Sequence, residues 1–229
     1  MQTTIVGMGE VGKGLYQVLA PFYPVTAIDK DNFVAVPTDI LHICFPCNFE
    51  KVAEFIGEVK KYQSAFKPKY TIIHSTVPVG TSRACNAIHS PIRGMHPYMD
   101  RSIRTFLKML GGEQASEVAD YFRRAELSVL LYDKQEETEA AKLFDTEYYR
   151  VCLEFVHRVK KYCDEKKLSF HNVYTLPNLS YNAGYNRLGK GEYMRPVLQP
   201  IMTKIGGHCV MQNKELISLS EENDGIDEK

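Results

Sequence analysis

The feature that most constrains the fold of this chain is a glycine-rich turn near its start, Gly7-Met8-Gly9-Glu10-Val11-Gly12. An apolar run over 4–6 precedes the turn and an amphipathic segment over 11–19 follows it, so the turn joins a predicted strand to a predicted helix. Gly7 permits the tight turn, Gly9 lets the backbone approach a pyrophosphate, and Gly12 lets the helix pack closely on the strand. Free N–H groups at the helix start attract phosphates. The turn therefore predicts a dinucleotide-binding domain of the Rossmann type.

An acidic residue after the second predicted strand indicates which dinucleotide binds. Asp29 follows the apolar run 25–28, about twenty residues after the glycine turn, where a carboxylate accepts hydrogen bonds from ribose hydroxyls. The same carboxylate repels a 2′-phosphate, so Asp29 favours NAD over NADP, and the adjacent Lys30 weakens that preference a little. The alternative is a glycine turn in a Rossmann-like domain that binds no dinucleotide.

Two later loops are assigned to the cofactor site because each follows a predicted strand. At the end of the run 41–45 stands a C-x-x-C motif formed by Cys44 and Cys47. After the strand 70–74 comes a turn over 75–80. We expect the first loop to line the adenosine or ribose side of the cofactor; redox or metal chemistry at the two cysteines is the alternative. The predicted cofactor residues are therefore the glycine turn with Asp29, Lys30, Phe45, Pro46, Cys47, Ser75 and Thr76.

Short apolar runs alternate with amphipathic segments over the first two thirds of the chain, which predicts an α/β fold with a doubly wound, mostly parallel sheet. Strands are predicted at 4–6, 25–28, 41–45, 70–74 and 128–132, and helices at 11–19, 49–62 and 113–125. The stretch 29–40 is short, so we predict a trimmed connection with at most a brief strand at 33–36. We expect an NAD-binding domain over 1–134. Residues 135–229 are expected to form a long helix and a small, loop-rich helical C-terminal region for catalysis and dimerisation.

One uninterrupted helix is predicted over 136–167, a stretch without Gly or Pro. Its apolar residues recur at steps of three and four and form one stripe: Ala141, Phe144, Tyr148, Val151, Phe155, Val159 and Tyr162. At about 1.5 Å per residue, roughly 30 residues span about 45 Å. Because a small domain does not cover such a stripe alone, we predict a homodimer through this helix. The alternative is that the C-terminal segment folds back over it.

The charge balance argues against partners that are bound by overall electrostatics. The 229 residues include 28 basic and 28 acidic side chains, and this zero net charge predicts no binding to nucleic acid or to an anionic membrane. No apolar run approaches the roughly 18 residues that span a bilayer, and the start of the chain lacks a signal-peptide pattern. Six scattered cysteines are typical of reduced thiols, so we expect a cytoplasmic protein.

Four further segments lie in a fixed order along the chain. They are the run 74–81 (His-Ser-Thr-Val-Pro-Val-Gly-Thr), Ser90-Pro91 with Gly111-Gly112 downstream, the run 140–144 (Ala-Ala-Lys-Leu-Phe), and Gly206-Gly207-His208-Cys209. In order and spacing they resemble the S-T-V-P-x-G-T loop, the substrate-side loop with its following strand, the central helix and the G-G-x-C motif of the UDP-glucose and GDP-mannose dehydrogenases. The resemblance implies a short member of that nucleotide-sugar dehydrogenase family.

Enzymes of this family oxidise the C6 alcohol of a sugar to a carboxylic acid with two NAD, by way of a cysteine thiohemiacetal and a thioester. The resemblance makes Cys209 the nucleophile and Lys142 the residue that stabilises the oxyanion and positions water. It makes Thr76 the residue that holds a water or the substrate hydroxyl near the nicotinamide. Thr146, one turn after Lys142, stands near the place of a family asparagine. The implied substrate is a sugar or nucleotide sugar.

Several positions depart from the family pattern. Ile92 and His96 stand where the family commonly has two glutamates, which leaves His96 as a candidate base. The amide pair Gln212-Asn213 replaces the Lys-Asp that usually follows the cysteine. The sequence ends before the family's third domain, which binds the nucleotide part of the substrate, so we expect altered substrate binding. No metal site is predicted, because the Gly-Gly-His-Cys motif lacks a second ligand pair at a suitable spacing.

Three functions stay open on the sequence. The first is an NAD-dependent oxidoreductase that oxidises a sugar or nucleotide-sugar primary alcohol through Cys209. The second is a catalytically degenerate NAD-binding module that regulates or assembles with other proteins, which the departures favour. The third is a small hydroxy-acid dehydrogenase similar to the 6-phosphogluconate-type enzymes, which also combine a Rossmann domain with a long helix and a catalytic lysine but need no cysteine.

Overall fold

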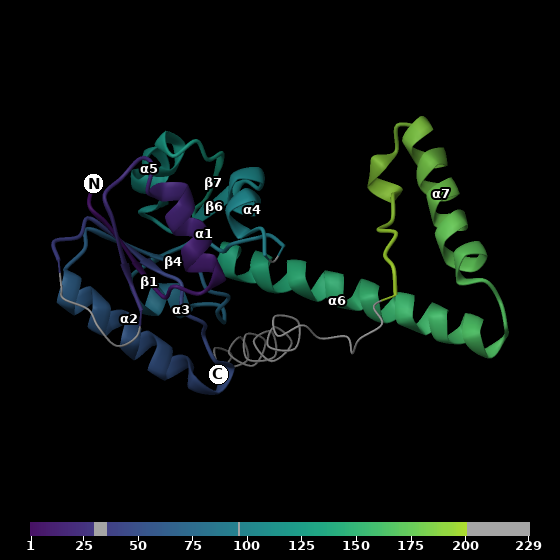
Figure 1. Cartoon of the computed structure of the whole chain (residues 1–229), viewed down its shortest axis with the longest axis horizontal. Coiled ribbons are helices and arrows are strands. Elements are labelled where there is room, and N and C mark those ends of the chain that lie inside the picture. The colour runs from purple at the N-terminus through teal and green to yellow at the C-terminus, as the bar shows by residue number, and fades with distance from the viewer. Residues whose placement is uncertain (30–35, 96, 201–229) are drawn as a thin grey trace, which may run out of the picture. The chain divides into compact units, whose positions relative to one another are not determined.

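The computed structural model describes residues 1–29, 36–95 and 97–200 (Figure 1). The chain divides into two compact units, the first containing Met1–Phe144 and the second Asp145–Lys214, of which the structure describes the part up to residue 200. The division falls inside the long helix α6 (Gln135–Glu165). Lys30, His96, Cys209 and the pair Gln212-Asn213 lie outside the described residues, as does most of the predicted brief strand 33–36.

The first unit is built on one sheet, which confirms the predicted Rossmann-type α/β fold. Among the described residues the sheet has seven strands in the order β2-β1-β3-β4-β5-β6-β7, and all neighbours are parallel except β5 and β6. The strands are β1 Thr3–Val6, β2 Val25–Ile28, β3 Ile40–Ile43, β4 Tyr70–Ile73, β5 Ile88–His89, β6 Lys108–Gly111 and β7 Val129–Tyr132. The central strands are buried on both faces, which is why they are mostly apolar and do not alternate between apolar and charged residues.

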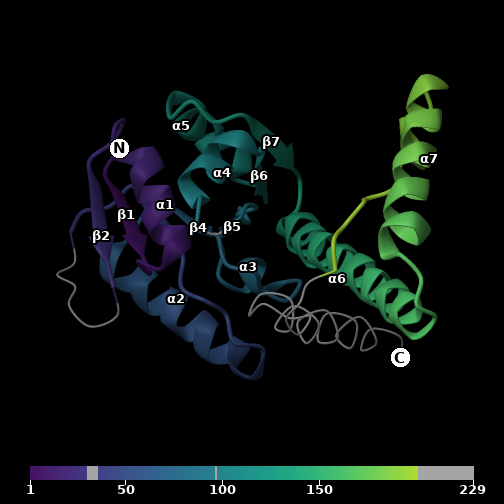
Figure 2. The same cartoon turned by 45° about the vertical axis from the view of Figure 1, so that its right-hand side comes forward.

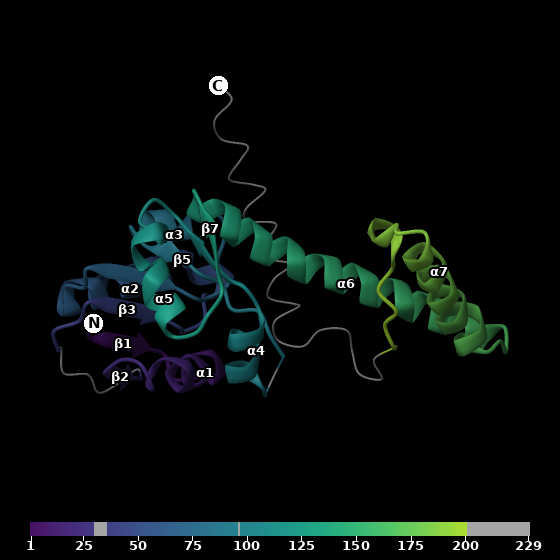
Figure 3. The same ribbon diagram turned by 90° about the horizontal axis from the view of Figure 1, so that it is seen from above.

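Helices cover both faces of this sheet. They are α1 Glu10–Leu19, α2 Val52–Phe66, α3 Thr81–Ala84, α4 Met99–Thr105 and α5 Ala119–Arg124. One apolar core joins α1, α4 and α5 to one face, and a second joins α2 and the end of α3 to the other. Figure 3 shows β1 and β3 between α1 on one side and α2 on the other. This two-sided cover is the doubly wound arrangement that the alternating sequence pattern predicts.

The strand order fixes where a ligand can approach the sheet. The chain runs from β1 to β2 on one side and then returns to form β3 on the other side of β1. In open parallel sheets this reversal leaves a crevice at the carboxyl ends of the two diverging strands, and ligands bind there. The loops after β1 and β3, residues 7–9 and 44–48, meet at this point.

Several short elements of the first unit were not placed by the sequence pattern. These are α3, β5 and α4, each too short to give a periodic signal, and β6, which only the resemblance indicated, as a strand after the substrate-side loop. The predicted helices 49–62 and 113–125 contain single 3-10 turns at Phe49–Lys51 and Ala115–Val118 before α2 and α5. The helix predicted over 49–62 continues to Phe66, where Lys67 adopts a left-handed backbone with φ of 47° and ends it. After β7 the chain passes directly into α6 (Figure 2).

The second unit is helical in its described part. It contains the later turns of α6, a π-helical segment His171–Thr175, helix α7 Leu176–Arg187 and a 3-10 turn Gly191–Tyr193. Helix α7 occupies much of the stretch after residue 169 that was expected to be loop. The sequence did not predict this helix because its polar composition gives no amphipathic pattern, and none of its residues is buried. No helix among the described residues is long and apolar enough to cross a membrane.

Candidate functional site

The glycine turn between β1 and α1 has the geometry that close approach of a ligand requires. Gly7 has a φ of +95°, and a Cβ there would lie 2.6 Å from the Phe45 backbone nitrogen. A Cβ on Gly12 would overlap the carbonyl oxygen of Gly7. A Cβ on Gly9 would meet nothing within 4 Å, so the space in front of that residue is open. The fold therefore needs glycine at positions 7 and 12, whereas Gly9 borders the space that a ligand would enter.

A pocket of about 380 Å³ lies at the crevice between β1 and β3. Its volume falls within the range of small-molecule sites. Its lining consists of Val6, Gly7, Met8, Gly9, Asp29, Cys44, Phe45, Pro46, Glu58 and Tyr62. Six of these are predicted cofactor residues, so the structure brings together the glycine turn, the acid after β2 and the loop after β3.

Two lining residues, Glu58 and Tyr62, come from α2 and were not predicted. They are one helical turn apart on the face of α2 directed at the loop after β3, and no sequence signal marks them, because they reach the pocket only through the packing of α2. Glu58 adds a second carboxylate to the pocket beside that of Asp29, and forms an exposed ion pair of 3.3 Å with Lys61. The pocket thus combines apolar walls, two acids and the open start of α1.

Other predicted cofactor residues lie on the first turn of α1 and on the loop after β4. Glu10, Val11 and Gly12 form the first turn of α1, whose N-cap Gly9 makes no side-chain hydrogen bond to the helix. The hydroxyl of Ser75 donates to the Phe45 carbonyl at 2.5 Å and ties the loops after β3 and β4 together. Thr76 follows in the same loop and is half-buried.

Cys47 is packed inside the core instead of facing the pocket. Its side chain is buried, and burial raises the pKa of the thiol to about 12, with a further contribution from Cys85. Cys44 lines the pocket, and burial raises the pKa of its thiol to about 12 as well, opposed by Lys108. Both thiols are therefore protonated at neutral pH, and a nucleophilic or redox role for the C-x-x-C motif receives no support. The five described cysteines are free thiols, and no group of described residues could hold a metal ion.

Hydrogen bonds tie the first turns of α6 to the loop after β4. Thr138 bonds through its hydroxyl to His89 Nδ1 at 2.8 Å, and His89 Nε2 bonds to the Ser75 carbonyl at 3.2 Å. A Cβ on Gly111 would lie 2.5 Å from the Thr138 hydroxyl. The Gly-Gly pair at the end of β6 therefore leaves room for α6 to begin against the sheet.

Lys142 lies on α6 one turn after this contact and is half-buried. The pKa of His89 is lowered to about 3, mainly by burial and less by the charges of Lys108 and Lys142. Lys142 follows Thr138 by four residues, so it lies on the side of α6 that bonds to His89 at the end of β5. Cys209 and His96 lie outside the described residues, so their position relative to Lys142 and Thr76 stays a prediction.

A chain of buried polar groups runs beneath this site on the α5 face of the sheet. His42 Nδ1 bonds to His74 Nε2 at 2.8 Å and His42 Nε2 to the Tyr121 hydroxyl at 3.1 Å. At the other end the Lys108 ammonium lies 3.2 Å from His74 Nδ1 and donates to the Ser90 carbonyl at 3.0 Å. Burial lowers the pKa of Lys108 to about 7 and of His42 to about 3.

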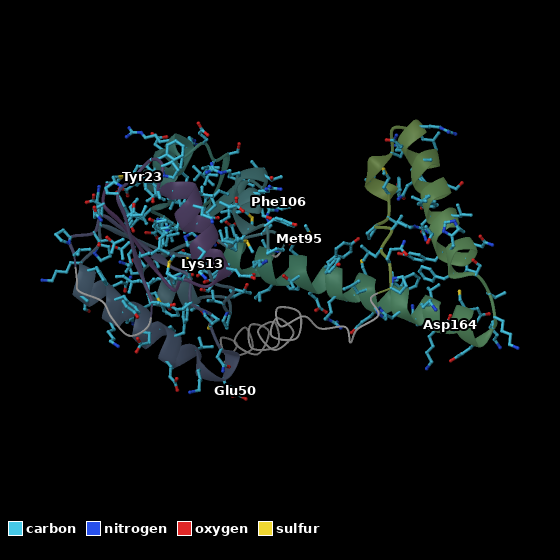
Figure 4. All side chains as sticks on the ribbon, viewed as in Figure 1. Lys13, Tyr23, Glu50, Met95, Phe106 and Asp164 are labelled. Atoms are coloured by element: carbon cyan, nitrogen blue, oxygen red, sulfur yellow. The ribbon has the colours of Figure 1, made fainter. Side chains whose placement is uncertain are left out.

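The structure explains the apolar residue at position 92, where the resembled family commonly has a glutamate. Ile92 is buried in the core that joins α1, α4 and α5 to the sheet, so this position serves packing and offers no acid. Beyond it, Met95 and Phe106, on the segments that flank α4, are exposed (Figure 4). The guanidinium of Arg93 lies over the Phe106 ring at 5.4 Å.

The parallel sheet, the glycine turn and the switch-point pocket define a Rossmann-type α/β protein. Similar solved structures are nucleotide-sugar dehydrogenases. A UDP-D-ManNAc dehydrogenase from Pyrococcus horikoshii matches with a TM-score of 0.74 at 13% identity, over 100% of this chain and 65% of the other. A UDP-N-acetyl-mannosamine dehydrogenase from Staphylococcus aureus matches with a TM-score of 0.68 at 12% identity, over 99% and 69%. A GDP-mannose dehydrogenase from Pseudomonas aeruginosa gives 0.63 at 14%, over 98% and 65%.

These likenesses confirm the predicted resemblance to nucleotide-sugar dehydrogenases at the level of the fold. No family model matches the chain, and no curated protein matches it. The chain spans about two thirds of the length of these dehydrogenases, 65% for the P. horikoshii enzyme. The structural match extends over both compact units of the chain.

Proposed function

We propose that this protein is an NAD-dependent dehydrogenase that oxidises the primary alcohol of a sugar or nucleotide sugar. The observation that carries the proposal is the switch-point pocket, in which the glycine turn and Asp29 meet within the fold of nucleotide-sugar dehydrogenases. The start of α1 suits a pyrophosphate because its N–H groups and dipole favour an anion. Asp29 suits the ribose hydroxyls of the adenosine half.

The pocket's charge supports NAD over NADP. Asp29 and Glu58 both line it, and a 2′-phosphate near two carboxylates would meet like charge. Phe45 and Tyr62 supply aromatic faces in the same pocket, against which a planar base can pack. The residues present therefore fit a dinucleotide, which when bound supplies the acceptor for the hydride of the alcohol carbon.

The chain's own groups would carry the remaining chemistry. Thr76 would hold the substrate hydroxyl, whose proton leaves as the C–H hydride is transferred, giving the aldehyde. The Cys209 thiol would add to that aldehyde, a second hydride transfer would leave a thioester, and water would release the acid and the thiol. Lys142 would stabilise the oxyanion in the addition and hydrolysis steps. Whether both oxidations occur depends on Cys209, which the resemblance alone assigns.

Turnover with defined variants tests this proposal. The purified protein is expected to form NADH with at least one member of a panel of sugars and nucleotide sugars. Cys209→Ser is expected to stop the reaction at one hydride per substrate, and Lys142→Met to lower kcat by at least about a hundredfold. NAD binding without NADH formation across the panel would contradict the proposal and favour a binding module. Full turnover by Cys209→Ser would instead favour a hydroxy-acid dehydrogenase.

We also propose a homodimer formed through residues 136–167. The predicted stripe of α6 is largely exposed in the single chain: Phe144, Tyr148, Val151, Phe155 and Tyr162 have relative exposures between 48% and 62%. Aromatic residues exposed on one helix face favour burial against a second copy. Light scattering should give twice the chain mass, and Tyr148→Glu should give the monomer mass. A monomeric wild-type protein at micromolar concentration would contradict this proposal.

A further inference from the structure

A buried carboxylate at the start of α6 holds the loop that carries Thr76. Glu139 has no exposed surface. Its Oε2 accepts the backbone N–H of Gly80 at 2.6 Å and its Oε1 accepts that of Ser82 at 2.7 Å. Gly80 has a φ of +91° and precedes α3, so the two N–H groups belong to a sharp turn that has few other partners available. One side chain thus completes the hydrogen bonding of the end of this loop.

The neighbouring residue makes a second connection to the start of the same loop. Thr138 bonds to His89, and His89 bonds to the carbonyl of Ser75. Two consecutive residues of α6 are therefore connected to the two ends of the segment 75–82. Thr138 is connected to Ser75 through His89, and Glu139 bonds directly to Gly80 and Ser82. Thr76 lies between these anchors.

We propose that Glu139 is a positioning residue, whose carboxylate holds the segment 75–82 against the start of α6 and so fixes Thr76 relative to Lys142. Lys142 follows Glu139 by three residues on the helix, so the residue that anchors the loop and the residue assigned to the oxyanion share one rigid turn. Errors of about 1 Å in such placements cost roughly a hundredfold in rate. The inference rests on the proposed function.

The ionised form of Glu139 makes this contact. A carboxylate accepts with both oxygens, whereas a protonated carboxyl directs its O–H at one of the two N–H groups and leaves that group unpaired inside the core. The amide of a glutamine has the same defect permanently, because its NH2 group donates and does not accept. Glu139→Gln therefore resembles the protonated state in size and hydrogen bonding.

The groups around Glu139 set the pH at which its carboxyl ionises. The pKa of Glu139 is raised to about 7. Burial and, to a smaller extent, the charge of Glu136 raise this pKa, while the bonds from Ser82 and Gly80 oppose both effects. Glu136 is paired with Arg83 at 2.7 Å, and its second oxygen is buried without a hydrogen-bond partner.

Two titratable neighbours of Glu139 keep their charge between pH 5 and 9. Burial lowers the pKa of His89 to about 3 and raises that of Cys85 to about 11, so both stay neutral. Lys142 on α6 and Arg83 on α3 supply the nearby positive charge. Burial lowers the pKa of Lys108 to about 7 as well, but its bonds are to His74 and Ser90. Glu139 is therefore the group bonded to the segment 75–82 that titrates near neutrality.

The pKa of Glu139 is raised above its ordinary value of 4.5, so its contribution to stability is full below that value and is lost as the pH rises through about 7. The loop contact has the opposite dependence, because it needs the ionised form. Activity that depends on the contact should therefore rise with pH through about 7, over a range in which the contribution of Glu139 to stability falls.

The first test is the pH dependence of kcat with saturating NAD and substrate. We expect a rise through about pH 7 in the wild type. In Glu139→Gln we expect a kcat that is about 10- to 100-fold lower and does not rise through pH 7, with an unchanged Kd for NAD. Glu136→Gln should shift the rise to lower pH, because it removes the neighbouring negative charge. Glu137→Gln, an exposed control on the same turn, should leave the profile unchanged. A wild-type pH profile of kcat in Glu139→Gln would overturn the inference. Equal losses of kcat in Glu139→Gln and in the control Glu137→Gln would also overturn it.

The second test needs no turnover, so it separates this inference from the proposed function. Amide hydrogen exchange of the segment 75–85, corrected for intrinsic rates, should show protection in the wild type that increases from pH 6 to pH 8. Glu139→Gln should lower that protection at least about tenfold at pH 8 while leaving the strands β1 and β3 protected. Equal protection in wild type and variant would overturn the inference even if the enzyme turns over. Confirmed protection without turnover would contradict only the proposed function.

Discussion

Lys108 directs its ammonium into the core between the sheet and α5, with polar partners on one side and the ring of Phe122 at 5.7 Å on the other. A charged Lys108 donates to His74 Nδ1, which places the proton of His74 on Nε2 and that of His42 on the nitrogen facing Tyr121. A neutral Lys108 lets His74 Nδ1 donate to the Ser90 carbonyl, which reverses the bonds between His74 and His42 and between His42 and Tyr121. The charge of one side chain thus sets the tautomers of two histidines.

This burial predicts a pH dependence of stability. Burial lowers the pKa of Lys108 from 10.5 to about 7, so its contribution is full above pH 10.5 and is lost as the pH falls through 7. Between pH 7 and 9 the free energy of unfolding of the wild type should rise relative to Lys108→Met, with a slope approaching 1.4 kcal/mol per pH unit. Urea denaturation at several pH values measures it. Lys13→Met, which changes an exposed lysine of α1 (Figure 4), should show no such difference.

Asp29 is the residue on which cofactor choice should depend. Asp29→Ala removes a pocket carboxylate, so NADP affinity should rise relative to NAD affinity by about tenfold, equal to roughly 1.4 kcal/mol. Fluorescence titration with the two reduced cofactors measures the ratio. Asp39→Ala, at a carboxylate that accepts the Gln2 N–H outside the pocket, is the matched control. An unchanged ratio in Asp29→Ala would mean that Asp29 does not face the 2′ position.

At the scale of elements, the approach of α6 to the end of β6 depends on Gly111. A Cβ there would lie 2.5 Å from the Thr138 hydroxyl and 2.7 Å from the Lys134 carbonyl oxygen, which belongs to the backbone and cannot rotate away. Gly111→Ala should therefore lower the free energy of unfolding by about 1–3 kcal/mol. Gly57→Ala is the control, because its Cβ meets nothing within 4 Å on α2 and should stabilise the helix by up to about 1 kcal/mol. Chemical denaturation that ranks the two variants in the reverse order would contradict this packing.

The elements that could be predicted from the sequence are those with a strong period or a defined turn. The strands β1, β2 and β4, the helix α1 and the long α6 all follow from apolar runs, the glycine motif or the sustained stripe. Short α3 and α4 give no period, and α7 has no buried face from which to recognise it. The pocket acid Glu58 could not be assigned because it acts through the packing of α2 on β3, a tertiary relation.

At the scale of the whole molecule, the described residues contain the parts that the sequence motifs bring together at the sheet edge. The glycine turn, Asp29 and the loop after β3 line one pocket, while the loop of Thr76 is bonded to the start of the helix that carries Lys142. The long-range bonds from Glu139 and from His89 have no sequence signal, because their partners lie 57 and 14 residues away. The pocket and the contacts of the Thr76 loop both belong to the first unit.

The measurement that tests the central claim most directly is calorimetric titration of NAD into the wild type and Gly9→Val. A Cβ at position 9 would meet no protein atom within 4 Å, so a valine side chain there would begin in the open space in front of the turn. We predict that Gly9→Val keeps the thermal stability of the wild type without ligand but binds NAD at least about tenfold more weakly. NAD at 100 times the wild-type Kd should then stabilise the wild type by about 2.7 kcal/mol and the variant by no more than about 1.4 kcal/mol. Equal NAD affinity in the two proteins, or no binding by the wild type, would contradict the account.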